Sequence, residues 1–270
     1  MKIWENTTIL DSYLGTFDLT KTKKEADVAI IGSKPIVLSE FSKLKGIFRV
    51  GVGLDNVPVE DAKRRNIRIQ ITSPETNEYI FEETANFTCH LILKMLYENS
   101  GTVEPWEIKI RGPLQDKSLL VIGSGNIGRR VLDKMQKFMM VKTFDLLENN
   151  FSDLKNMLPT VDCVTLHIPL TNRNRNYFDK EKLSRMRYGS ILINTARGAI
   201  VSENALFEEI NNGRLKAAFD VFWEKPYSGK LRQFHPDRFY MTPHVASKCD
   251  KYIKSAAKDF KSFIKELEND

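Results

Sequence analysis

Three glycines between an apolar run and an amphipathic run constrain this chain more than any other feature. Gly123, Gly125 and Gly128 form the pattern GxGxxG, directly after a predicted strand at 119–122 and at the start of a predicted helix at 127–138. In that setting the first glycine permits a tight turn, the second lets the main chain approach a pyrophosphate, and the third lets the helix pack closely on the strand. Free amides at the start of the helix then face the anion. The segment predicts a dinucleotide-binding unit of the Rossmann type.

An acidic residue follows the glycines. A second predicted strand at 141–144 ends at Asp145, 17 residues after Gly128. A carboxylate there can accept hydrogen bonds from both hydroxyls of an adenosine ribose and would repel a 2′-phosphate, which favours NAD over NADP. The alternative, that Asp145 only caps a strand end, is weakened by the correctly placed glycines. Asn126 and Ile127, in the first turn of the helix, are assigned to the same cofactor site.

The remaining chain alternates short apolar runs with amphipathic ones. Strands are predicted at 27–33, 46–52, 67–71, 119–122, 141–144, 161–167, 191–195, 217–221 and 240–242. Helices are predicted at 59–65, 82–97, 127–138, 152–157, 179–186, 203–211 and 247–270, with a loop at 98–113. Strands that alternate with helices and are too apolar for a half-exposed sheet indicate an α/β fold with parallel sheets.

Composition excludes several other classes. The 270 residues carry a net charge of +6, but the basic residues are scattered among acidic ones, so no nucleic-acid partner is expected. No run approaches the ~18 apolar residues of a membrane span, and no signal peptide is evident, so we expect a cytoplasmic protein without a membrane partner. The three cysteines lack CxxC spacing, which argues against a disulfide framework or a cysteine zinc site, and no metal is expected.

Several further segments, taken together, resemble the D-isomer-specific 2-hydroxyacid dehydrogenase family, which includes phosphoglycerate dehydrogenase. The resemblance covers roughly residues 27–250, and its segments occur in the family's order and spacing. These are RVGVGLDNVPVEDAKRRNI, SPETNEYIFEETANF, the glycine turn, DCVTLHIPLT, MRYGSILINTARGAIVSENAL, AAFDVFWEKP and MTPHVAS.

The resemblance implies two domains. A Rossmann-type, doubly wound parallel-sheet domain at 94–247 would be inserted into a smaller flavodoxin-like α/β substrate domain made of 1–93 and 248–270. The active site would lie in the cleft between them. Only 48 residues precede RVGVG, fewer than the family pattern leads us to expect. The segment 98–117 is also short for the arm that relatives use in dimer contacts. A homodimer is still expected, with Trp106 as a residual anchor of that arm.

The resemblance also assigns catalytic roles. Arg197, in NTARG, matches the arginine that binds the substrate carboxylate and carbonyl, since a guanidinium can bridge both while charge develops on the carbonyl oxygen. His244, in TPH, matches the acid/base that gives a proton to the alkoxide or takes it back. The other three histidines are His90, in a helix, His167, beside the cofactor side, and His235, in a polar loop.

Further residues are assigned to ligand binding by the same resemblance. The backbone amides of Val52 and Gly53 match the segment that receives the substrate carboxylate. Arg49 either adds positive charge for a carboxylate or phosphate or is a plain surface arginine. The remaining cofactor residues are Ile168 and Pro169 at the adenine, Thr195 and Ala196 at the nicotinamide, Asp220 near the carboxamide, and Ser247.

One catalytic position departs from the family pattern. A glutamate normally precedes the proline of this segment and pairs with the catalytic histidine, but here Lys225 precedes Pro226 and Glu224 comes one residue early. A cation beside His244 would lower its pKa. Either Glu224 reaches His244, or the enzyme works without the carboxylate, or much activity is lost. Our hypothesis is that activity remains. If Lys225 faces His244, keto-acid reduction should decline at a lower pH than in a relative with glutamate.

Two functions of different classes follow from these residues. The first is an oxidoreductase that transfers a hydride between NAD(H) and a small D-2-hydroxy acid or its 2-keto acid, with a phosphoglycerate-like acid compatible with Arg49. The alternative is a catalytically weakened NAD-binding regulator or scaffold on the same fold, which Lys225 favours.

Overall fold

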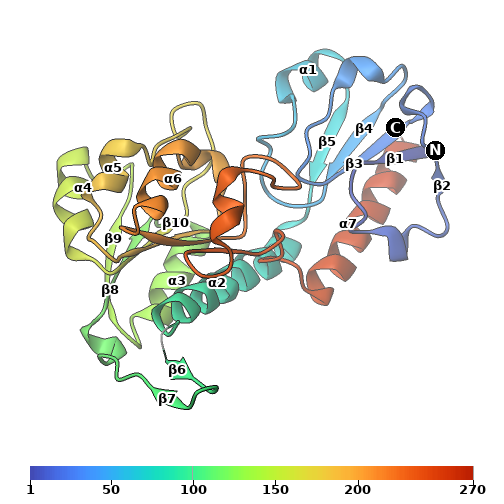
Figure 1. Ribbon diagram of the computed structural model, residues 1–270. Helices are drawn as coiled ribbons and strands as arrows, with labels where there is room; N and C mark the ends of the chain where they lie inside the picture. The colour runs from blue at the N-terminus through green and yellow to red at the C-terminus, as the bar shows by residue number, and fades with distance from the viewer. Residues whose placement is uncertain (99, 270) are drawn as a thin grey trace. The chain divides into compact units, whose positions relative to one another are not determined.

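The computed structural model describes residues 1–98 and 100–269 (Figure 1). Asn99 and Asp270, which belong to the predicted arm and the predicted C-terminal helix, lie outside the described residues. The chain forms two compact units. The terminal unit consists of Met1–Ile80 and Lys248–Asp270, and the inserted unit consists of Phe81–Ser247.

The terminal unit is built on a parallel sheet. Within the described residues its five strands have the order β2-β1-β3-β4-β5. They are β1 (Lys2–Glu5), β2 (Asp18–Leu19), β3 (Val28–Ile31), β4 (Gly46–Arg49) and β5 (Arg68–Ile71). The predicted strands at 27–33, 46–52 and 67–71 are therefore confirmed in shorter form. Strands β1 and β2 were not predicted, because charged residues flank the two apolar residues of β1 and because β2 is only two residues long.

Helices cover both faces of this sheet because its side chains alternate. Ile47 points to the face covered by α1 (Val59–Arg64), where Ala62 belongs to the same buried cluster. The neighbouring Phe48 points to the other face and packs against Phe260 and Phe263 of α7 (Asp250–Asn269). The predicted C-terminal helix is thus confirmed over 250–269. Three-residue 3₁₀ turns at Asp11–Tyr13, Lys23–Glu25 and Leu38–Glu40 serve as connections here.

The inserted unit carries the larger sheet. Within the described residues its six parallel strands have the order β13-β12-β11-β10-β8-β9. They are β8 (Ser118–Ile122), β9 (Met140–Phe144), β10 (Cys163–Leu166), β11 (Ile191–Asn194), β12 (Lys216–Phe219) and β13 (Phe239–Met241). Each matches a predicted strand to within two residues at either end. The predicted α/β class with doubly wound parallel sheets is confirmed.

Alternation along the strands again explains the two helical layers. Leu120 and Ile122 of β8 share a buried cluster with α4 (Phe151–Met157), α5 (Lys180–Arg185) and α6 (Glu203–Asn211). Leu119 and Val121 share another with α2 (Pro74–Leu96) and α3 (Asn126–Met135). Figure 1 shows these two sets of helices on opposite sides of the sheet. No helix among the described residues is long and apolar enough to cross a membrane.

Helix α2 begins eight residues before the predicted start at 82. Pro74 occupies its first position, where the missing amide hydrogen costs nothing, and the Ser73 hydroxyl accepts a hydrogen bond from the Thr76 amide at 3.2 Å. The division between the two units falls inside this helix, after Ile80, rather than at the predicted 93/94. The reason is packing, because Leu91 and Met95 belong to the core of the inserted unit.

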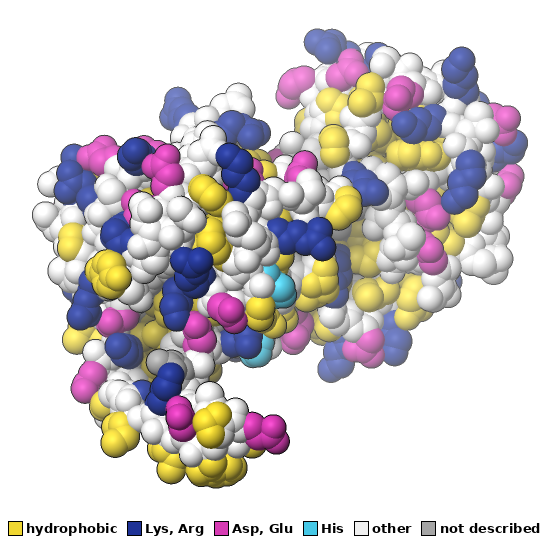
Figure 2. All heavy atoms as spheres, viewed as in Figure 1, with side chains coloured by type: hydrophobic (Ala, Val, Ile, Leu, Met, Phe, Trp, Pro, Cys, Tyr) yellow, Lys and Arg dark blue, Asp and Glu magenta, His cyan; other side chains and the backbone are white. Residues whose placement is uncertain are grey.

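The segment predicted as a loop at 98–113 contains a small antiparallel hairpin. Gly101–Thr102 (β6) pairs with Glu107–Ile108 (β7). The apolar side chains of this arm are exposed, with Trp106 at 78% and Ile110 at 98%. Hydrophobic side chains gather on the arm at the bottom of Figure 2. The arm is too small to bury a core of its own. Contacts within the arm therefore do not explain why so many of its residues are apolar.

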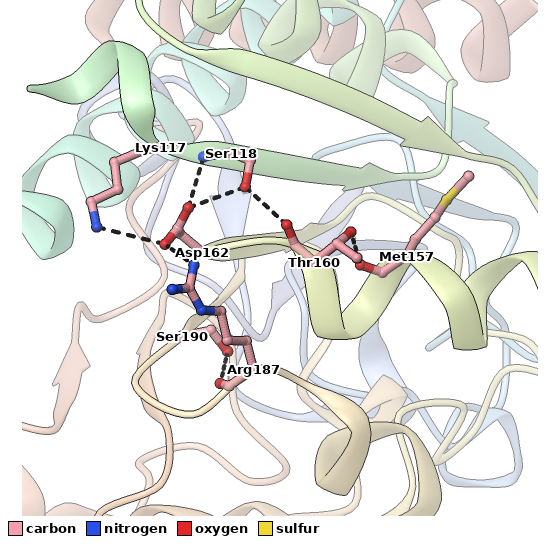
Figure 3. A network of polar contacts seen from close by, with 7 residues as sticks. All are labelled: Lys117, Ser118, Met157, Thr160, Asp162, Arg187 and Ser190. Atoms are coloured by element: carbon pink, nitrogen blue, oxygen red, sulfur yellow. Dashed lines mark hydrogen bonds and ion pairs between the residues drawn. The ribbon is translucent and has the colours of Figure 1, made fainter.

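A polar network ties together the amino ends of three strands (Figure 3). Asp162, just before β10, accepts hydrogen bonds from the Ser118 amide at 2.9 Å and hydroxyl at 3.1 Å. Its other oxygen accepts from Arg187 at 3.0 Å and lies 3.6 Å from the Lys117 ammonium. The network closes the amino end of the sheet, which leaves the carboxyl ends of the strands for ligands.

Candidate active site

The predicted cofactor and catalytic residues of the inserted unit lie along one edge of its sheet. In an open parallel sheet, ligands bind beyond the carboxyl ends of the strands. The residues that follow those ends are the glycine turn after β8, Asp145 after β9, Ile168 and Pro169 after β10, Thr195 to Arg197 after β11, Asp220 after β12, and His244 after β13. The fold therefore gathers side chains that are separated by up to about half of the chain.

The glycine turn has the form that the sequence predicts. Gly123 adopts a positive φ of 97°. A Cβ added at position 128 would lie 1.8 Å from the Gly123 carbonyl oxygen, so only glycine permits this packing of α3. At Gly125 an added Cβ would meet nothing within 4 Å, so the main chain is open to a ligand. The first turn of α3, with Asn126 and Ile127, therefore fits a pyrophosphate.

Asp145 is held at the end of β9 by backbone amides. Its carboxylate accepts hydrogen bonds from the Ser124 amide at 2.7 Å and the Leu147 amide at 3.0 Å. These two bonds orient the group beside the glycine turn. A carboxylate has about four acceptor positions, so two remain for ribose hydroxyls. Together with the turn, this arrangement fits a dinucleotide.

The residues after β10 form an apolar wall next to the glycine turn. Ile168 is buried, and its Cγ2 would lie 3.0 Å from a Cβ at Gly123. The carbonyl of Pro169, the next residue, accepts a hydrogen bond from Asn174 at 3.0 Å. His167 is half-buried, with its Nε2 3.0 Å from the Thr165 hydroxyl, and desolvation by the surrounding protein lowers its pKa to about 3. His167 is therefore neutral at physiological pH.

Arg197 lies in a tight turn after β11. The buried Asn194 fixes this turn, since its side chain accepts from the Ala196 amide at 3.0 Å and donates to the Arg197 carbonyl at 2.9 Å. A Cβ at Gly198 would lie 2.2 Å from the Phe222 carbonyl carbon, so glycine lets the turn approach the segment after β12. Thr195 is buried, with its hydroxyl 2.8 Å from that of Thr88 in α2.

Asp220 anchors the loop that carries His244. This fully buried carboxylate accepts hydrogen bonds from the Thr242 hydroxyl at 2.6 Å and from the amides of Val245 and Ala246, both at 2.9 Å. Burial raises the pKa of Asp220, and these three bonds oppose that rise. His244 itself has a φ of +60°, uncommon for a residue with a side chain, so the loop holds it in a strained conformation.

The segment after β12 brings Lys225, rather than Glu224, to His244. The Lys225 ammonium nitrogen is in hydrogen-bond contact with His244 Nδ1. The Glu224 carboxylate instead accepts from the Ser228 amide at 3.1 Å and from the Ser228 hydroxyl, and these bonds lower its pKa. Glu224 was predicted as a catalytic candidate that could replace the missing carboxylate. The structure directs it to Ser228, because adjacent side chains on this turn point in different directions.

The predicted substrate residues of the terminal unit follow β4. Val52 and Gly53 are half-buried in the turn after that strand. Arg49 is buried, and its guanidinium donates to the Gly53 carbonyl at 3.0 Å and to the Val50 carbonyl. These bonds show that Arg49 stabilises its own loop. Neither of the two roles considered from the sequence, a charge for the substrate or a plain surface arginine, includes this one. The contact of Arg49 with a substrate, and those of Val52 and Gly53, stay predictions.

The remaining predicted site residue is Ser247. Ser247 is half-buried between β13 and α7, and its contact with a cofactor also stays a prediction. No cluster of three or more His, Cys, Asp or Glu side chains that could hold a metal ion occurs within the described residues. Sequence reasoning did not single out Asn194 or Thr242. The available signals were that Asn194 opens the NTARG segment and that Thr242 lies two residues before His244.

The chain is similar to several known proteins. Residues 98–246 match the model of the D-isomer specific 2-hydroxyacid dehydrogenase NAD binding domain. The chain is 30% identical over 263 residues to hydroxypyruvate reductase of Thermotoga maritima, with 90% of this chain and 85% of that protein covered. It is also 30% identical over 262 residues to D-3-phosphoglycerate dehydrogenase of Methanocaldococcus jannaschii, with 88% of this chain covered. It spans 49% of the length of that second relative.

A solved structure is similar over the whole chain. The crystal structure of D-lactate dehydrogenase from Aquifex aeolicus, complexed with NAD and lactic acid, has a TM-score of 0.81 and 22% identity. The alignment covers 100% of this chain and 97% of that one, which supports the fold. The family model and the relatives together show that this chain belongs to the D-isomer-specific 2-hydroxyacid dehydrogenase family of NAD-dependent oxidoreductases.

Proposed function

We propose that the chain reduces a small 2-keto acid to its D-2-hydroxy acid, or carries out the reverse reaction, with Arg197 binding the substrate and His244 handling the proton. The observation that carries this proposal is the shared sheet edge. Arg197 follows β11 and His244 follows β13, on either side of β12 and at the same edge as the glycine turn. When bound there, NADH supplies the hydride.

The chain's own residues account for the rest of the chemistry. A guanidinium at Arg197 can bridge the carboxylate and the keto oxygen, and its charge stabilises the alkoxide that develops on reduction. His244 supplies the proton that the alkoxide needs. The terminal unit is proposed as the substrate domain. Relatives named for hydroxypyruvate, glyoxylate and 3-phosphoglycerate support a small hydroxy acid, including a phosphorylated one, as the substrate.

A panel of keto acids tests the function directly. Hydroxypyruvate, glyoxylate, pyruvate and phosphohydroxypyruvate are each mixed with NADH and the purified chain, and NADH oxidation is followed by absorbance. Steady oxidation with at least one acid, lost in Arg197→Ala, supports the enzyme. Tight NADH binding without turnover across the panel supports the second candidate, a catalytically weakened NAD-binding regulator. The contact of Lys225 with His244 is the observation that favours this second candidate.

Replacement of Asp145 is expected to weaken NADH binding. The variant Asp145→Asn removes the charge that would accept the ribose hydroxyls, so the dissociation constant for NADH should rise on the order of 10-fold. NADPH affinity should fall less, because the repulsion of its 2′-phosphate is also removed. Fluorescence titration with both cofactors measures this. The exposed Asp133→Asn in α3 is the charge-matched control, and equal losses for both cofactors would contradict the assignment.

We also propose that the chain forms a homodimer through the β6–β7 arm. Val103, Trp106, Ile108 and Ile110 of the arm are all more than 70% exposed, and such an apolar set is costly in water. Sedimentation velocity should give about twice the chain mass of 31.1 kDa, and Trp106→Ser should shift it toward the monomer. Tyr188→Ser, which removes another exposed aromatic ring of the inserted unit, is the control. A wild-type monomer at micromolar concentration would refute the dimer.

A further inference from the structure

We propose that Lys225 and His244 form one proton-donating pair, in which the Lys225 ammonium keeps the proton of the neutral imidazole on Nε2 and replaces that proton through Nδ1 once it has been given to the substrate. The proposal rests on the function proposed above. It makes Lys225 a positioning residue that acts through His244. It commits the site to keto-acid reduction at neutral pH.

The contact itself determines the tautomer. A lysine ammonium has three donors and no acceptor, whereas a neutral imidazole has one donor nitrogen and one acceptor nitrogen. Since the Lys225 ammonium contacts Nδ1, that nitrogen must be the acceptor, and the single ring proton lies on Nε2. A carboxylate partner has the opposite effect, because it accepts from Nδ1–H and leaves the Nε2 of the neutral ring as an acceptor.

This difference changes which protonation state of His244 can donate the proton that keto-acid reduction needs. With a carboxylate partner, only the imidazolium carries a proton on Nε2. With Lys225, the neutral imidazole already carries one. When that proton moves to the alkoxide oxygen, the Nε2–H bond breaks and the new O–H bond forms. One proton then passes from the lysine nitrogen to Nδ1. The products are the hydroxy acid, a neutral imidazole with its proton on Nδ1, and a neutral lysine amine.

The surroundings of the pair allow Lys225 to regain its proton after each turnover. Lys225 is exposed, so water can return the proton to its amine. The charge of Lys225 acts on the carboxylate of Asp220, which already accepts hydrogen bonds from Thr242, Val245 and Ala246. Glu224, the adjacent acidic group, is bound to Ser228. The same bonds that fix the loop thus keep both carboxylates from replacing Lys225 at Nδ1.

The pair also revises the pH dependence expected from the sequence alone. That expectation treated the imidazolium as the sole proton donor, so reduction would fail once His244 lost its charge. With the pair, the transferable proton remains after His244 has lost its positive charge, until the lysine ammonium itself is deprotonated. Keto-acid reduction should therefore persist through neutral pH. Oxidation of the hydroxy acid requires the neutral pair and should appear only in alkaline solution.

A lysine-to-arginine exchange separates this proton transfer from a simple charge effect. Arginine keeps the positive charge and the donor at Nδ1 but does not release a proton, since its pKa exceeds 12. Reduction by Lys225→Arg should fall on the order of 10²-fold at about pH 8 and recover toward wild type in acid, where His244 becomes an imidazolium. Lys225→Glu should restore a profile that declines as the imidazolium is lost. Lys230→Arg, on an exposed neighbouring lysine, is the matched control.

A measurement without substrate or cofactor tests the same pair independently of activity. Nitrogen-15 NMR of the histidine rings distinguishes a protonated from an unprotonated ring nitrogen, and His244→Asn identifies the signal of His244. The neutral ring should carry its proton on Nε2 in the wild type and in Lys225→Arg, and on Nδ1 in Lys225→Glu. Titration should also give a higher pKa for His244 in Lys225→Glu than in the wild type.

Each result has a definite meaning. A wild-type ring protonated on Nδ1 overturns the proposal even if the keto-acid panel shows turnover. Wild-type rates in Lys225→Arg near pH 8 also overturn it, because charge alone would then suffice. If the panel shows no turnover but the ring is protonated on Nε2, the proposed function fails and the geometry of the pair stands. Melting temperatures of all variants confirm that a lost rate does not come from unfolding.

Discussion

Arg197→Ala is expected to lower kcat/KM for keto-acid reduction by about 10²–10³-fold, the cost of removing one preorganised donor from a developing oxyanion. Both kcat and KM should change, because in the proposed role the guanidinium contacts the substrate carboxylate in the ground state and binds the carbonyl oxygen more strongly as charge forms there. NADH affinity should stay near the wild-type value, since the glycine turn and Asp145 lie on other loops of the same edge.

Two further variants sharpen this first prediction. Arg197→Lys should recover only part of the loss, because an ammonium cannot hold a carboxylate and a carbonyl in one planar fork. Arg187→Ala removes an arginine of the same unit that lies in the Asp162 network at the amino end of the sheet (Figure 3), and it should leave kcat/KM unchanged. Equal losses in Arg187→Ala and Arg197→Ala would mean that the effect is structural.

His244→Asn is expected to lower kcat for reduction by about 10²–10⁴-fold, the usual contribution of a general acid. Asparagine is the best test residue here, because it tolerates the left-handed conformation that His244 adopts at φ +60° and so preserves the loop. The pH dependence that arises from the pair with Lys225 should disappear in this variant. Stopped-flow measurement at saturating NADH over a range of pH values checks both effects.

The control for this second prediction is another histidine. His90 is an exposed residue of α2, and His90→Asn should leave the rate and its pH profile unchanged. Loss of rate in His244→Asn with the wild-type pH profile retained would assign the proton to a different group. In that case the shared sheet edge would still hold the cofactor and Arg197, but His244 would no longer be the acid.

Much of the fold was predictable because its signals are local. An apolar run of the inserted unit must be a buried strand if helices flank it, and the glycine spacing after β8 allows few other structures. Boundaries were less predictable. The first two turns of α2 lack a regular apolar stripe, so periodicity placed its start at 82, although Ser73 and Pro74 are a standard helix start. The strand β1 has only two apolar residues, Ile3 and Trp4, between charged ones, and β2 is only two residues long, so neither shows an apolar pattern.

Some residues of the candidate site were predictable from the sequence, and others required the structure. Asp145 was predicted from the strand end that follows the glycine turn, whereas Arg197 and His244 were predicted from the resemblance of NTARG and TPH to the family's motifs. Arg49 was not predictable, since nothing in the sequence shows that its guanidinium turns back to its own loop. The role of Asp220 as an anchor also required the structure, because its three partners lie more than 20 residues further along the chain.

The sequence by itself determined the α/β class and the cofactor turn, because periodicity and glycine spacing are written in short segments, and its resemblance to the family supplied Arg197 and His244 as the predicted catalytic positions. It could not decide whether Glu224 or Lys225 meets His244. Those residues are adjacent, and the direction of each side chain depends on a turn whose path is set by the close approach of Gly198 to Phe222 and by the Asp220 anchor. Only the tertiary structure decides that Lys225 contacts His244. The ring nitrogen of His244 that carries the proton in the proposed pair depends on this contact.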